Sequence, residues 1–182
     1  MLYCADTHTG GRSMERNQAV ATGVPIGLQP TEGPAFWTMG QLMTIKLRKS
    51  DTAGELGAME TLLPPNVAVP SHIHHRESEV NFVLEGWMRF TLDGQVFECG
   101  PGGLVYLPSG HAHRFETGPD GARMLAIALP GGLEALYERV GVPASERRLP
   151  TIPADVAGWM ALAPEFGIEV LGPPPGGSRP RP

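Results

Sequence analysis

Short apolar segments separated by turn residues fill the middle of the chain. Between about residue 36 and residue 130, the strand-length segments are FWTMGQLMTIKLR, GELGAMETLLP, EVNFVLEG, WMRFTLDG, QVFECG, LVYLP, HAHRFET and RMLAIALP. Glycine, proline or an Asp-Gly pair separates one segment from the next, which is typical of an all-β domain. Asp93-Gly94 predicts a two-residue hairpin turn, because such a turn needs a positive φ at both positions.

Alternation within the central segments indicates strands with one buried face. Met88, Phe90 and Leu92 fall on one face of a strand, and the residues between them fall on the other. About eight antiparallel strands in so short a stretch predict a sandwich or a barrel. The predicted fold class is therefore all-β.

The sequence divides into four parts. Residues 1–23 are polar and predict a flexible arm, residues 24–130 carry the strands, and the proline- and glycine-rich residues 171–182 predict a disordered tail. Residues 131–170 show helical spacing, first in LEALYERVGV, with Gly141 as a stop, and then in ADVAGWMALAPEFGIEVLGP. Pro153 is expected in the first turn of this second helix. Both helices should pack on the exterior of the barrel or on a second subunit.

Composition and charge exclude several classes of function. Fourteen basic and nineteen acidic residues give a net charge of −5, without the basic cluster of a nucleic-acid site. No stretch approaches the roughly 18 apolar residues of a membrane span, and the first residues lack the pattern of a secretory signal. Two cysteines do not form a disulfide framework. We therefore expect a cytoplasmic protein with neither a nucleic-acid nor a membrane partner.

Five of the six histidines fall between residues 72 and 113. His72 and His74 share a strand face because alternate residues do so, Glu79 begins the next strand, and His113 follows a Pro-Ser-Gly turn. Three imidazoles and a carboxylate suit a first-row divalent metal and leave positions for water, O2 or a substrate. One histidine alone is better explained as a hydrogen-bonded residue, but this set, if buried without an ion, would leave several polar groups unpaired.

Polar residues beside these candidates have simpler interpretations. His75 is expected in an exposed turn or behind the ligands, and His111 in a turn. Arg76 and Glu77 are interpreted as a solvated loop.

The spacing of these residues resembles the two signature motifs of the cupin superfamily. The first motif is HIHHRESEVNFVLEG (72–86) and the second is GGLVYLPSGHAH (102–113). Thr117 stands where many members have asparagine, and no glycine opens the first motif, but neither position is a metal ligand. The resemblance covers roughly residues 36–130 when the strand pattern is included.

The resemblance implies a single small cupin-type β-barrel, a double-stranded β-helix or jelly roll, followed by the two C-terminal helices. It also implies a homodimer and a metal ion bound by His72, His74, Glu79 and His113. The chain layout is similar to bacterial single-domain quercetin 2,3-dioxygenase-like proteins. By that resemblance the metal is Ni, Fe, Mn, Co or Zn, and Glu79 is also the base that takes the proton of an enol or flavonol hydroxyl.

Inward strand positions predict the wall of a substrate pocket. The candidates are Met43, Met59, Asn81, Met88, Phe90, Tyr106 and Phe115. This mostly apolar set suits a planar or hydrophobic small molecule, although each methionine alone is more simply a core residue. Trp37, Trp87 and Trp159 are expected to contact the outer face, the helices or a second subunit.

Three hypotheses of function remain open. The leading one is a metal-dependent dioxygenase that acts with O2 on a flavonol-like, aromatic or enolic small molecule. The second is a non-redox isomerase, cyclase, lyase or decarboxylase of secondary metabolism that uses the ion as a Lewis acid. The third is a binding module without turnover.

Overall fold

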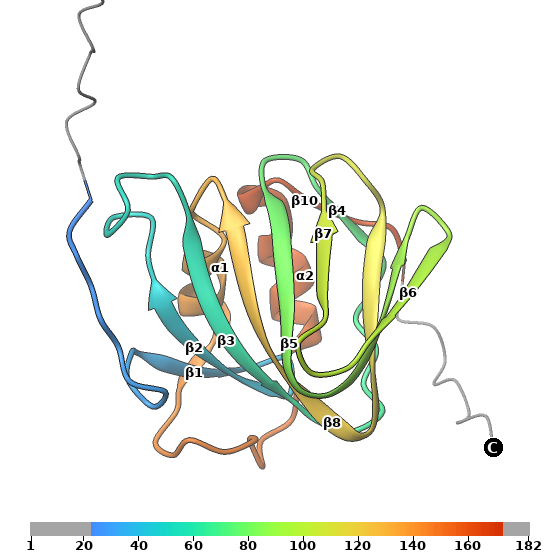
Figure 1. Cartoon of the computed structure of the whole chain (residues 1–182), viewed down its shortest axis with the longest axis horizontal. Coiled ribbons are helices and arrows are strands. Elements are labelled where there is room, and N and C mark those ends of the chain that lie inside the picture. Colours follow the sequence, from blue (N-terminus) through green and yellow to red (C-terminus); the bar gives the residue numbers. More distant parts are fainter. Residues whose placement is uncertain (1–22, 173–182) are drawn as a thin grey trace, which may run out of the picture.

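Antiparallel strands are the main secondary-structure elements of the computed structural model, which describes residues 23–172 (Figure 1). The strands are β1 (Ala35–Thr38), β2 (Gln41–Leu47), β3 (Gly57–Leu63), β4 (His72–His74), β5 (Ser78–Leu92), β6 (Gln95–Cys99), β7 (Leu104–Leu107), β8 (His113–Leu129), β9 (Val142–Pro143) and β10 (Ile168–Val170). The helices are α1 (Glu134–Val140), α2 (Val156–Leu162) and the short 3-10 helix η1 (Ala163–Phe166). The predicted fold class, all-β with two C-terminal helices, is therefore confirmed.

The predicted division into four parts stays a prediction. The arm predicted for residues 1–23 and the tail predicted for residues 171–182 lie almost wholly outside the described residues.

The strands form one strongly curved sheet. Its main path runs β10-β4-β8-β3-β2-β1-β9, and β5 pairs with β8, β7 and β6. Two long strands, β5 and β8, pair with each other over most of their lengths and form the centre of the sheet. The curvature encloses an apolar interior, and the two helices lie against one side of it (Figure 1).

Each long strand combines two of the predicted segments. A glycine with positive φ lies at the bend of each, Gly86 (φ 77°) in β5 and Gly121 (φ 76°) in β8. A Cβ atom on Gly86 would collide with the carbonyl oxygen of Gly121, so the two strands approach closely here only because residue 86 is glycine. The pairing register shifts at this point, as it does at a β-bulge.

The predicted hairpin turn is confirmed. Asp93 and Gly94 both have positive φ, 46° and 82°, and Leu92 pairs directly with Gln95 across the two-residue turn.

The C-terminal segment differs from its prediction in two details. Helix α1 ends at Gly141 as predicted, but α2 begins after Asp155, whose side chain accepts a hydrogen bond from the backbone N–H of Gly158 at 2.8 Å. Pro153 therefore lies before the helix rather than in its first turn. The segment predicted as one helix also ends early, because Gly167 adopts a left-handed conformation and the following residues form β10.

No helix within residues 23–172 has the length and apolar character needed to cross a membrane.

Candidate metal centre and adjoining cavity

The histidine-bearing strand β4 is only three residues long and is fixed by its neighbours. On one side it pairs with β10, where His74 lies opposite Ile168 and His72 opposite Val170. On the other side His72 pairs directly with His113 of β8. Alternation then directs His72 and His74 to the same side, so pairing between distant segments brings three histidines together.

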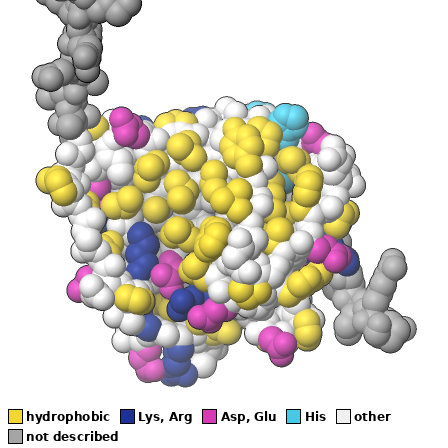
Figure 2. All heavy atoms as spheres, viewed as in Figure 1, with side chains coloured by type: hydrophobic (Ala, Val, Ile, Leu, Met, Phe, Trp, Pro, Cys, Tyr) yellow, Lys and Arg dark blue, Asp and Glu magenta, His cyan; other side chains and the backbone are white. Residues whose placement is uncertain are grey.

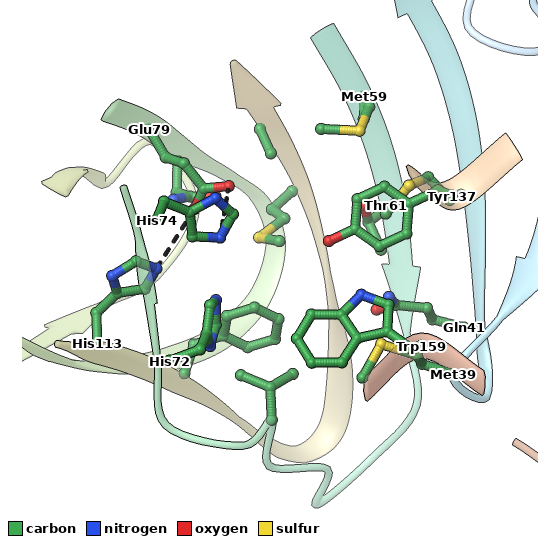
Figure 3. A pocket seen from close by; sticks show the side chains of 16 residues that line it. Met39, Gln41, Met59, Thr61, His72, His74, Glu79, His113, Tyr137 and Trp159 are labelled. Carbon is green, nitrogen blue, oxygen red and sulfur yellow. Dashed lines mark ion pairs between the residues drawn. The ribbon is translucent and has the colours of Figure 1, made fainter. Parts of the chain in front are cut away.

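The side chains of His72, His74 and His113 form a compact buried cluster. Each has a ring nitrogen within 4.8 Å of one in each of the other two, and their exposed fractions are 7%, 2% and 2%. Glu79 closes the group: one carboxylate oxygen lies 4.0 Å from Nε2 of His74 and the other lies 3.9 Å from Nε2 of His113. The structure thus brings the four predicted ligands together (Figure 3).

Backbone carbonyls orient two of the imidazole rings. Nδ1 of His72 lies 2.8 Å from the carbonyl oxygen of Pro70, and Nδ1 of His113 lies 3.0 Å from that of His111. A carbonyl only accepts, so Nδ1 is the protonated nitrogen and the lone pair is on Nε2. Within residues 23–172, Nε2 of His113 is buried without a hydrogen-bond partner.

The electrostatics of the cluster favour neutral imidazoles at His72 and His113 beside an ionised Glu79, and they favour a protonated His74. Burial, followed by the nearby His113 and His74, lowers the pKa of His72 to about 3. Burial also lowers the pKa of His113. Burial alone would raise the pKa of Glu79, but the neighbouring histidines outweigh it and lower that pKa. Burial alone would lower the pKa of His74, but the nearby carboxylates of Glu79 and Glu77 outweigh burial and raise that pKa.

These residues fit a divalent metal ion. Neutral imidazole nitrogens and a carboxylate are the donors that Zn, Fe, Ni, Co and Mn accept in proteins. An ion would also satisfy the unpartnered nitrogen of His113. His72, His74, Glu79 and His113 would hold the ion, and the donor set does not select one metal.

A cavity adjoins the cluster and extends toward the helices (Figure 3). Its wall consists of the four candidate ligands together with Met39, Gln41, Met43, Met59, Thr61, Val69, Asn81, Phe115, Met124, Ala126, Tyr137 and Trp159. The cavity is small: the volume open to the centres of water molecules is about 40 Å³. This is room for only a few waters. The wall is mostly apolar, so polar groups in it have few alternative partners.

Three polar atoms of this wall lack hydrogen-bond partners among the described residues. They are Oγ1 of Thr61, Nδ2 of Asn81 and Nε1 of Trp159, each on a side chain that is at most 2% exposed. Buried polar groups are nearly always hydrogen-bonded. A ligand in the cavity would be within reach of these groups.

The helices supply two wall residues that the sequence did not indicate. Trp159 of α2 is 2% exposed, and its ring lies 5.8 Å from that of His72, so this tryptophan lines the cavity, a position that the sequence placed behind contacts with the outer face, the helices or a second subunit. Tyr137 of α1 directs its hydroxyl into the cavity opposite the histidines (Figure 3). Burial and the charge of Glu79 raise the pKa of Tyr137, so its hydroxyl stays protonated and can donate. Nothing in the sequence placed either helix over the cavity.

The residues predicted for the pocket wall divide into three groups. Met43, Met59, Asn81 and Phe115 line the cavity. Met88 and Phe90 are fully buried in the core but are not part of the wall. Tyr106 does not face inward: it is 55% exposed on the outer face, where its hydroxyl donates to Ser78 at 3.3 Å. Val105 and Leu107 take the inward positions of β7 instead.

The polar residues next to the candidate ligands in the sequence lie in different environments. His75 is exposed and interacts with Glu169 at 2.9 Å, and exposed His111 interacts with Asp93 at 2.5 Å, so neither joins the cluster. Glu77 was expected in a solvated loop, but it is only 5% exposed and lies behind His74. The turn between β4 and β5 is too short for consecutive side chains all to reach solvent.

Comparisons with known proteins agree with this fold. Residues 59–128 match the family model described as the cupin domain, a segment that contains all four candidate ligands. This part of the chain is therefore similar to a cupin domain. Among solved structures, an RmlC-like cupin from Shewanella frigidimarina has a TM-score of 0.52 and 17% identity, covering 63% of this chain and 98% of its own. An oxalate decarboxylase variant from Bacillus subtilis has a TM-score of 0.51 and 19% identity, covering 69% of this chain and 35% of its own.

A curated relative adds a functional comparison. Quercetin 2,3-dioxygenase from Bacillus subtilis is 27% identical over 120 residues, which are 66% of this chain and 36% of that enzyme. The chain thus spans about a third of the length of this relative. The similarity is weak, and it makes an enzyme within the cupin superfamily a reasonable interpretation.

Proposed function

We propose that this protein is a metal-dependent dioxygenase acting on a compact enolic or single-ring aromatic molecule. One observation carries the proposal: three buried histidines and a glutamate open onto a closed, mostly apolar cavity. The similarity to quercetin 2,3-dioxygenase supports the oxygenase class. When bound, the ion supplies Lewis acidity and a place where O2 and an electron-rich oxygen of the substrate can meet.

Glu79 is proposed as the base. Its lowered pKa keeps it ionised at neutral pH, and its carboxylate faces the cavity among the histidines. A group in this state and position can accept the proton of an enol or phenol hydroxyl within hydrogen-bond reach. The apolar side chains of Met43, Met59 and Phe115 exclude water, which strengthens electrostatic interactions within the site.

The opposite wall is proposed to position the substrate. The hydroxyl of Tyr137 points across the cavity toward the histidines, and the indole N–H of Trp159 lies beside Tyr137 on the same wall (Figure 3). Both groups donate, so they suit a carbonyl or hydroxyl oxygen at the far end of the substrate. The small cavity favours a molecule that is shorter than the three-ring flavonol expected from the sequence.

Oxygen consumption tests this proposal. The protein loaded with Fe, Ni, Mn, Co or Zn is given acetylacetone, catechol or quercetin, and dissolved O2 and products are followed. We expect O2 uptake with at least one compact substrate at a higher rate than with quercetin. Turnover that continues unchanged without O2 would refute the oxygenase and support the non-redox enzyme. Tight, reversible binding without conversion would support the binding module.

The homodimer is proposed on separate grounds. The outer face of the sheet carries exposed apolar side chains, among them Leu104 (57%), Tyr106 (55%) and Leu129 (40%). Hydrophobic side chains gather on this face in Figure 2, and such patches mark interaction sites. Light scattering of Leu104→Glu against the unaltered protein tests it: a dimer that the substitution leaves intact would contradict this interface. The cytoplasmic location and a role in secondary metabolism stay predictions.

A further inference from the structure

Glu77 is a buried carboxylate in the turn that joins the ligand strand β4 to β5. Its neighbours in the turn point outward: His75 interacts with Glu169, and the Arg76 guanidinium donates to the carbonyl oxygen of Glu165 at 3.1 Å. Glu77 alone turns inward, where it is 5% exposed. A buried carboxylate is costly unless it is paired, so its partner requires an explanation.

That partner is the nitrogen of His74 that faces away from Glu79. Oε2 of Glu77 lies 3.7 Å from Nδ1 of His74, while Nε2 of the same ring faces Glu79 at 4.0 Å. In the described part of the chain, neither Nδ1 of His74 nor Oε2 of Glu77 has any hydrogen-bond partner. A small approach of the two atoms would satisfy both, with Nδ1–H as the donor and the carboxylate as the acceptor.

His74 therefore differs from the other two histidines. Neutral backbone carbonyls hold Nδ1 of His72 and of His113, whereas a carboxylate faces Nδ1 of His74. The difference also concerns charge. Glu79 offsets only one of the two positive charges of a divalent ion, and a buried charge needs compensation. With Glu77, two carboxylates would balance the ion.

We propose that Glu77 is a positioning residue for the metal centre. It holds His74 with Nδ1 protonated and Nε2 directed toward the ion, and it supplies the second negative charge. This inference rests on the metal centre of the proposed function. Carboxylates behind metal-bound histidines set ring orientation and raise ligand basicity, and their loss typically lowers metal affinity by about 10–100-fold.

Cobalt binding tests this role without any substrate. Metal-free protein and the variant Glu77→Gln are titrated with Co²⁺ in competition with a chelator, and the visible absorption of bound cobalt is recorded. We expect Glu77→Gln to bind cobalt about 10–100-fold more weakly and to shift the absorption bands. Gln keeps the shape of Glu, so affinity and bands equal to those of the unaltered protein would overturn the inference.

Glu134→Gln is the matched control. Glu134 is equally buried, at 2% exposed, but its carboxylate accepts from the backbone N–H groups of Lys49 and Gly132 at 2.6 and 2.9 Å. Its loss should lower stability and leave cobalt affinity unchanged. A second comparison uses His74→Ala: because Glu77 acts in part through His74, replacing Glu77 with Gln should lower cobalt affinity less in that background than in the unaltered protein, and an undiminished effect would contradict the mechanism.

A measurement on the unaltered protein covers the case in which Glu77→Gln does not fold. Long-range ¹⁵N–¹H NMR of the imidazoles should show His74 in the Nδ1–H form, and the opposite tautomer would overturn the inference. If the unaltered protein binds no cobalt, the metal centre itself is refuted. If it binds cobalt and Glu77→Gln matches it, only the role of Glu77 is refuted.

Discussion

The two ends of the cavity have different origins. The metal end is built by β4, β5 and β8, from residues that lie within 72–113 and belong to two sequence motifs. The opposite end is closed by Tyr137 and Trp159, which the C-terminal helices bring from outside the matched cupin domain. The matched segment thus supplies the candidate ligands, and the C-terminal helices supply part of the wall across from them. We therefore expect substitutions at one end to change metal binding and chemistry, and those at the other to change substrate preference.

The largest effect is expected from removing a histidine at the metal end. His113→Ala loses a donor nitrogen that is buried and without a hydrogen-bond partner within residues 23–172. Its Co²⁺ affinity should fall by more than the roughly 10–100-fold that follows loss of an outer partner. Cobalt titration measures it, with His111→Ala, an exposed histidine outside the cluster, as control. Equal affinities of the two variants would remove His113 from the site.

Glu79→Ala should separate chemistry from metal binding. Three imidazoles remain, so this variant should keep more of its metal than of its activity. Loss of a general base typically costs about 10²–10⁴-fold in rate. Elemental analysis together with turnover of an identified substrate measures both quantities. Full activity in Glu79→Ala would refute the base role.

Changes at the opposite wall should affect the substrate alone. Tyr137→Phe and Trp159→Phe each remove a donor, and one hydrogen bond is worth about 0.5–1.5 kcal/mol. The loss of that free energy would raise the substrate KM by roughly 2–13-fold. We expect the Co²⁺ affinity to stay unchanged. Trp37→Phe is the control, because its indole donates to the carbonyl of Arg148 outside the cavity. If the KM of Tyr137→Phe and of Trp159→Phe is as unchanged as that of the control, this wall does not recognise the substrate.

The smallest effect concerns the metal-free protein at low pH. The pKa of His72 is about 3 when folded, below its ordinary value of 6.5. Between pH 6.5 and pH 3 the His72 imidazole is therefore protonated in the unfolded chain but not in the folded protein. As the pH falls through this range, His72 lowers the free energy of unfolding more and more. His72→Gln should lose less stability over this range, as measured by urea unfolding at several pH values. Parallel losses in both proteins would contradict the lowered pKa of His72.

The sequence predicted the four residues that the structure brings together, and part of that information is local. Alternation places His72 and His74 on one face, and the hairpin at Asp93-Gly94 follows from turn chemistry. Glu77 shows the limit of local reasoning. In the sequence, a glutamate between polar residues is typical of a solvated loop. Only the packing of β10 and η1 against this turn directs the neighbouring side chains of His75 and Arg76 outward.

Tyr106 and Trp159 show the same limit in opposite directions. Tyr106 was assigned inward, but the register of β7 against β5 places it outside, opposite Val80. Trp159 is expected from the sequence to contact the outer face, the helices or a second subunit, but the docking of α2 buries it in the cavity wall. A one-residue change in register or a different docking of a helix reverses a side chain's environment, and neither is encoded in nearby residues.

The sequence by itself determined the all-β class, the hairpin and the four candidate ligands, because strand period, turn geometry and ligand spacing are local properties. Only the tertiary structure decided that β10 holds the ligand strand, that a second carboxylate lies behind His74, and that two helices close the cavity. These features depend on pairing and packing between segments that are far apart in the chain. The chemistry at the metal end is thus largely readable from the sequence, while the choice of substrate depends on the folded wall.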